Sequence, residues 1–191
     1  MIAVVILGLM ILGVESSNTL ESNSSSDSAE SIDSILRVKR AMGLNMKFAQ
    51  EVLDEHNKYR KLHGVPPLKL TETMMLRAHF SVGEVSNLRP SGTFYGENVY
   101  KGEGPLSAKQ VVESWYNGIQ YYKNFFGGEP KEVSKDEKKK IGQFAQIIWK
   151  KTTELGVGVT QKNGQWFVVT AYNPRGLSYG SYKENVLRPK A

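Results

Sequence analysis

The chain of 191 residues is long enough for one ordinary domain with short attachments. Its residues are 40% hydrophobic and 23% charged, with 25 Lys and Arg against 19 Asp and Glu, and this composition excludes global disorder. The absence of Cys excludes a disulfide scaffold, a thiolate metal site and a cysteine nucleophile. Any site that needs imidazole must use His56, His63 or His79.

The first residues of the chain are typical of a targeting signal. Residues 2–14 are apolar and uncharged, a length that suits the core of a signal peptide and is too short to cross a membrane comfortably. We therefore predict a signal peptide over residues 1–16 and a secreted, extracellular protein. An uncleaved membrane anchor is the alternative, because the usual basic flank is missing.

Residues 17–40 are rich in Ser and acidic side chains, without an apolar period. Such a composition buries too little to offset the entropy of ordering, so we predict a disordered propeptide. Asn23 begins a glycosylation acceptor pattern. Residues 37–40 hold three cations and resemble the site of furin-type convertases, which predicts cleavage after Arg40. A short basic linker or the start of a helix is the alternative.

Charge divides unevenly between this segment and the rest of the chain. Residues 1–40 hold three cations and five anions, a charge of −2. Because the whole chain has a net charge of +6, the other 151 residues carry a charge of +8. A basic extracellular domain suits anionic lipid, glycosaminoglycan or a microbial surface, and nucleic acid is not an expected partner there. The mixed run at residues 135–140 is interpreted as a solvated loop.

Apolar side chains at helical spacing predict a first helix from Phe48 to Leu62 and a second that begins near Thr71. A strand is predicted from Gly96 to Tyr100. Ser107 then opens a third helix with a capping-box pattern.

This third helix is predicted to continue as far as Gly127, and a short fourth helix covers residues 142–149. Residues 157–162 and 165–170 are rich in β-formers and flank Asn163-Gly164, the strongest short-range signal of a hairpin. Helices followed by an antiparallel hairpin predict an α+β class, with helices that cover a sheet.

Four sequence blocks resemble the CAP superfamily of cysteine-rich secretory proteins, antigen 5 and plant pathogenesis-related type 1 proteins. They read HNKYR from His56, GENVY from Gly96, VVESWY from Val111, and GQFAQIIWKKTTELGVG from Gly142, which leads into FVVTAYNPRG. Without Cys, the chain is most similar to the short Golgi-associated branch. The resemblance implies that residues 41–191 form a CAP domain, a three-layer α-β-α sandwich with a central, mostly antiparallel sheet. The signature residues are His56, Asn57, Arg60, Gly96, Asn98, Trp115, Trp149 and Tyr172.

Many members of the superfamily hold two His and two Glu in a central cleft that binds zinc. Carried over residue by residue, three of these positions fall on Glu97, Gly118 and Gln143, and residues 87–93 contain no His for the fourth. One carboxylate with an amide and a glycine does not make a tight zinc site. The resemblance therefore implies a vestigial cleft with no metal or other cofactor, in which Arg89 either adds a cation or pairs with Glu97.

The remaining titratable residues give no catalytic pair, so we predict that the protein is not an enzyme. General acid–base catalysis needs two titratable groups within reach of a substrate. Glu113 lies in the right block but on a different helix face from Gly118. His56 is expected to pack and to form hydrogen bonds, His63 to lie near a surface turn, and His79 to lie on the face of the second helix.

Two kinds of binding function remain open. The resemblance implies a lipid or sterol carrier, in which Met74, Met75 and residues 121–126 line an apolar slot, although such a stripe is more often part of a core. The alternative is a secreted ligand for a protein receptor or a cell surface, including an anionic membrane, which binds through exposed loops. The sequence sets no oligomeric state.

Overall fold

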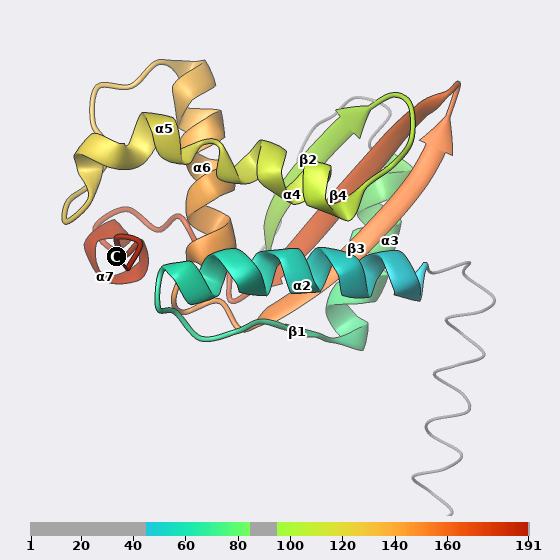
Figure 1. Cartoon of the computed structure of the whole chain (residues 1–191), viewed down its shortest axis with the longest axis horizontal. Helices are drawn as coiled ribbons and strands as arrows, with labels where there is room; N and C mark the ends of the chain where they lie inside the picture. The colour runs from blue at the N-terminus through green and yellow to red at the C-terminus, as the bar shows by residue number, and fades with distance from the viewer. Residues whose placement is uncertain (1–44, 85–94, 191) are drawn as a thin grey trace, which may run out of the picture. The chain divides into compact units, whose positions relative to one another are not determined.

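A four-stranded sheet lies between helices in the residues that the computed structural model describes, 45–84 and 95–190 (Figure 1). No helix among these residues has the length and apolarity needed to cross a bilayer. The predictions for the signal peptide, the propeptide, Asn23, Arg40 and Arg89 fall outside the described residues. The elements are α2 (Met46–Leu62), β1 (Lys69–Leu70), α3 (Glu72–Glu84), β2 (Gly96–Gly102), α4 (Ala108–Tyr116), α5 (Ile119–Tyr122), η2 (Lys123–Phe125), α6 (Lys135–Ile148), β3 (Glu154–Lys162), β4 (Gln165–Asn173) and α7 (Tyr182–Asn185).

The sheet is mixed, with the strand order β1-β3-β4-β2. The β2–β4 and β3–β4 pairs are antiparallel, and the short strand β1 runs parallel to β3. The predicted hairpin between β3 and β4 is confirmed. Asn163 and Gly164 have φ of 52° and 78°, the left-handed conformation that a two-residue turn of type I′ requires at both positions.

Strand β4 is buried on both faces, which explains its almost continuous apolar sequence. Val168 and Tyr172 face the main core beneath α2, α4 and α6, whereas Val169 and Ala171 face α3. On that second face, a Cβ added at Gly156 would lie 1.9 Å from a backbone oxygen of α3, so α3 packs closely on β3. The expected α-β-α sandwich is thus confirmed (Figure 1).

The interpretation of residues 135–140 as a loop is wrong, because they form the first turns of α6. Ser134 is the N-cap, and its Oγ accepts a hydrogen bond from the backbone N–H of Glu137 at 3.3 Å. The Glu137 carboxylate accepts in return from the backbone N–H of Ser134 at 2.9 Å. This reciprocal capping box fixes the start of α6 ahead of the predicted position.

The third predicted helix is interrupted. Ser107 caps its first part, α4, with Oγ accepting from the backbone N–H of Gln110 at 3.5 Å. α4 ends at Tyr116, and α5 begins after Gly118. A Cβ at Gly118 would lie 2.0 Å from the carbonyl oxygen of Lys140, so α6 passes against the backbone at this break.

Candidate functional site

Two adjoining cavities follow β2, an edge strand of the sheet, and we call them together the β2 groove. The first cavity, of about 440 Å³, is lined by Lys101 and Gly118 among others, where β2 meets α4, α5 and α6. The second, of about 300 Å³, includes Glu97. Both are lined by Val99 and Gln143, so they form one elongated depression.

The carboxylate of Glu97 is held by α3. Its Oε1 accepts a hydrogen bond from Ser81 Oγ at 2.8 Å and lies 3.3 Å from the Arg77 guanidinium, and the side chain is only 4% exposed. Because side chains alternate along a strand, Glu97 and Val99 share the α3 face of the sheet. Arg77 and Ser81 were not among the predicted site residues, although their spacing of four residues on a predicted helix places both on one face.

Gln143, at the position of a family histidine, is bound to the strand. Its Nε2 donates to the carbonyl oxygen of Val99 at 3.3 Å, and the Trp115 indole donates to the same oxygen at 3.1 Å. The backbone carbonyl of Gln143 accepts from Asn98 Nδ2 at 3.0 Å. Both Gln143 interactions thus attach α6 to β2.

The three carried-over cleft positions do not converge on one point. Glu97 lines the second cavity and Gly118 the first, and Gln143 alone lines both. Across residues 45–84 and 95–190, no three His, Cys, Asp or Glu side chains are grouped so that they hold a metal ion. Glu113 is exposed on α4 and lines neither cavity.

His56 is fully buried beside the groove in a hydrogen-bond network centred on Tyr172. Its Nδ1–H donates to the Val52 carbonyl at 2.8 Å, so Nε2 of the neutral ring accepts from the Tyr172 hydroxyl, also at 2.8 Å. That hydroxyl accepts from Asn98 Nδ2 at 3.3 Å and from Thr170 Oγ1 at 3.0 Å. Burial lowers the pKa of His56 to about 4, so the imidazole is neutral at pH 7.

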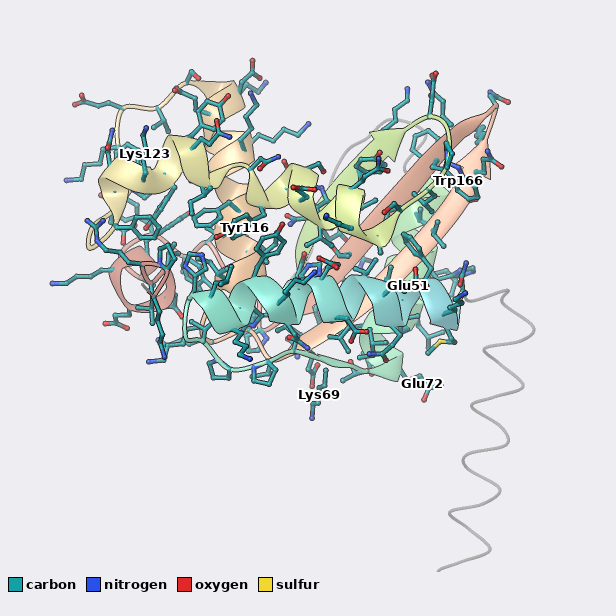
Figure 2. All side chains as sticks on the ribbon, in the orientation of Figure 1. Glu51, Lys69, Glu72, Tyr116, Lys123 and Trp166 are labelled. Atoms are coloured by element: carbon teal, nitrogen blue, oxygen red, sulfur yellow. The ribbon has the colours of Figure 1, made fainter. Side chains whose placement is uncertain are left out.

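His63 lies in the turn after α2, between the exposed residues Leu62 and Gly64, but its own side chain is buried. Its Nδ1–H donates to the carbonyl of Leu187, and its Nε2 accepts from the Tyr116 hydroxyl at 2.9 Å. Figure 2 shows Tyr116 in the space between α4 and α2, where its ring stacks on Tyr59 with centroids 3.8 Å apart. Burial lowers the pKa of His63. His79 lies half-buried on α3, beside the ring of Phe80.

Arg60 joins α2 to the far end of α6. The guanidinium donates to the carbonyl of Pro66 at 2.6 Å and to the carbonyls of Ile147, Trp149 and Thr152 at 2.9, 3.0 and 2.9 Å. The residue is fully buried. Burial lowers its pKa to about 10, so the guanidinium is still charged at pH 7, and the carbonyl dipoles around it stabilise that charge.

The other signature residues stabilise the same framework. The Asn57 amide exchanges two hydrogen bonds with the backbone of Leu68, at 3.1 and 2.7 Å. Trp149 is buried against Tyr182, with ring centroids 5.1 Å apart. Gly96 lies so close to α6 that a Cβ would be 2.3 Å from the Gln146 side chain.

Of the residues suggested for an apolar slot, Met74, Met75 and Tyr122 belong to the core, whereas Tyr121 is exposed and lines the first cavity. Met74 and Met75 are each 1% exposed, and Phe126 is half-buried against the main core. None of these three lines the β2 groove. A third cavity of about 320 Å³, with Val133 and Ile141 in its wall, adjoins the groove, because Lys138, Leu177 and Tyr182 line both it and the second cavity.

Comparison with known proteins gives these residues a family context. The profile of the cysteine-rich secretory protein family, CAP, matches residues 53–172. Human Golgi-associated plant pathogenesis-related protein 1 is 35% identical over 154 residues, which cover 75% of this chain and 95% of that protein. Secreted protein RBT4 of Candida albicans is 35% identical over 158 residues, 75% of this chain and 42% of that protein. The crystal structure of NaASP2 with Zn²⁺ has a TM-score of 0.57 and 17% identity over 74% of this chain and 85% of its own, a likeness of fold.

Proposed function

This chain belongs to the cysteine-rich secretory protein (CAP) family, and from that membership we propose that it is a secreted, non-catalytic binding protein whose cleft works without a metal ion. The observation that carries the proposal is the state of the Glu97 carboxylate, which Arg77 and Ser81 hold at 4% exposure. Zinc sites draw three or four ligands from the protein, and Gly118 and Gln143 supply neither imidazole nor carboxylate.

The lining of the groove also supports a non-catalytic role. General acid–base catalysis needs a titratable pair of matched pKa that faces the substrate. Among the residues that line the groove in the described part of the chain, Glu97 is the single carboxylate and there is no His. NaASP2, crystallised with Zn²⁺, has the same fold at low identity, and its metal is not carried over to this chain.

Secretion rests on the N-terminal sequence and on the relatives. The proposed signal peptide covers residues 1–16, and the related Candida protein is named as secreted. The human relative is named as Golgi-associated. We propose entry into the secretory pathway, followed by cleavage after Arg40 and release of the domain.

Mass spectrometry of the full chain secreted from a eukaryotic host tests both parts of this proposal. Under denaturing conditions we expect the mass of a polypeptide that starts at Ala41. Under native conditions, after incubation with zinc, we expect the mass of that polypeptide with nothing bound. A denatured mass that corresponds to a polypeptide starting near residue 17 contradicts convertase cleavage. If the unchanged protein retains one zinc ion and the Glu97→Gln variant does not, the metal-free cleft is contradicted. If both proteins retain zinc equally, the zinc is bound elsewhere.

Carriage of an apolar ligand is the second candidate function. The adjoining cavity of about 320 Å³ supports it, because Val133, Ile141 and Leu177 give that cavity apolar walls. In the same native spectrum, added mass of a sterol or fatty acid favours this function. A protein receptor would instead give binding that weakens as salt rises, with no added mass.

A further inference from the structure

We propose that the β2 groove binds an anionic, sulfated or carboxylated glycan, an inference that rests on the metal-free binding function above. The groove combines lysines with amide and hydroxyl side chains in an elongated depression. These three features together suit a charged sugar chain better than a metal, a compact anion or an apolar ligand.

Charge comes first. Lys138, Lys139 and Lys140 on α6 line the groove and are exposed. Lys101 on β2 also lines the first cavity, but its Nζ lies 5.8 Å from the centroid of the Phe167 ring, on the α3 face of the sheet. The one carboxylate of the described lining, Glu97, is paired with Arg77 and so offsets little of this charge. A concave surface lined by one sign of charge concentrates ligands of the opposite sign.

Acidic side chains offset part of this charge, because Asp136 and Glu137 interact electrostatically with Lys140, and Glu129 and Glu132 line an adjoining cavity together with Lys138. Asp136 and Glu137 lie in the first turn of α6, and neither lines the groove. Lys140 is positioned over an aromatic ring, with Nζ 3.0 Å from the Tyr121 hydroxyl and 4.6 Å from the ring centroid. This ammonium therefore lies at the first cavity, where Tyr121 is also part of the wall.

Neutral polar groups distinguish a glycan from a simple anion. Asn117 and Gln120 are exposed, line the first cavity, and carry amides that both donate and accept. Sugar hydroxyls need both kinds of partner, whereas a phosphate or sulfate ion uses donors only. The Tyr121 ring adds an apolar surface for the face of a sugar ring.

The shape of the groove favours a chain over a membrane surface. Its two cavities, of about 440 and 300 Å³, are each in the size range of small-ligand sites and share Val99 and Gln143. A ligand that extends along β2 fills both, while a planar bilayer reaches only the rim. The ligand class is therefore a short stretch of an acidic polysaccharide.

Titration of the secreted protein with a short heparin oligosaccharide, at low and at physiological ionic strength, tests this inference. We expect binding that weakens with salt, and an affinity about tenfold lower in the double variant Lys139→Gln, Lys140→Gln. The matched control, Lys47→Gln with Lys162→Gln, makes the same change in net charge at exposed sites outside the groove and should retain the affinity. Asn117→Ala with Gln120→Ala should also weaken binding, although it leaves the charge unchanged.

Other results of the titration would overturn either the glycan inference or the metal-free function. Equal losses in the groove and control variants mean that net charge and not the groove binds the oligosaccharide. Binding to vesicles of phosphatidylserine and phosphatidylcholine, without binding to the oligosaccharide, identifies a lipid ligand and overturns the glycan. If EDTA abolishes binding of the oligosaccharide, the metal-free function is contradicted. If a protein that holds no zinc does not bind the oligosaccharide, the glycan inference is overturned and the metal-free function is not.

Discussion

Gly118 occupies the position at which the family resemblance places a glutamate, and its missing side chain is a packing requirement. A Cβ there would lie 2.0 Å from the Lys140 carbonyl oxygen, a backbone atom that moves only with α6. We expect Gly118→Ala to lower the free energy of unfolding by about 2 kcal/mol, measured by urea denaturation. Gly83→Ala is the control, because nothing lies within 4 Å of its added Cβ, and it should be neutral or slightly stabilising.

Gly118→Glu extends the same test to the cleft. Restoring the carboxylate should destabilise the domain without creating zinc affinity, since the side chain must displace α6. A stable Gly118→Glu protein that binds zinc would contradict this account of the break between α4 and α5.

Single residues of the site were only partly predictable. The blocks that resemble the family located Glu97, Gly118 and Gln143, and their residue types already argued against zinc. The partners of Glu97 were not found, because Arg77 and Ser81 reach it from α3 through tertiary packing. The burial of His63 was missed for the same reason, since the carbonyl of Leu187 comes from the other end of the domain.

At the scale of elements, Arg60 holds the end of α6 in place. The last carbonyls of a helix lack partners within it, and Arg60 supplies donors to Ile147 and Trp149. We expect Arg60→Lys to lower the free energy of unfolding by about 3 kcal/mol, because an ammonium does not reproduce the planar guanidinium and leaves buried carbonyls unpaired. Chemical denaturation measures the loss, with Arg188→Lys, at an exposed site, as the control. Equal stability of the two variants would contradict the role of Arg60.

Elements were predictable where their signals are local. Apolar periodicity located α2, and Asn163-Gly164 specified the hairpin through its left-handed backbone. The start of α6 carried a readable signal in Ser134 and Glu137, which the run of lysines obscured. The break at Gly118 had no comparable signal, because it depends on the approach of a distant helix. The two-residue strand β1 is too short to show a period.

For the whole molecule, the buried imidazoles predict how stability depends on pH. Between pH 6.5 and about 4 the unfolded chain protonates His56 and the folded chain does not, so the free energy of unfolding falls as pH falls through this window. The difference corresponds to about 3 kcal/mol for His56, and His63 acts in the same direction. Urea denaturation at several pH values measures the loss, and NMR titration should show the His56 ring still neutral at pH 5. A His56 resonance that titrates near pH 6.5 would contradict the burial.

The double hydrogen bond to the Val99 carbonyl also bears on self-association. An edge strand such as β2 exposes backbone groups that a strand of another molecule is able to pair with, and this is a common start of aggregation. The Trp115 indole and the Gln143 amide occupy the carbonyl at the middle of that strand. The Val99 carbonyl is therefore already paired within the domain, and a strand of another molecule does not find it free at the middle of this sheet edge.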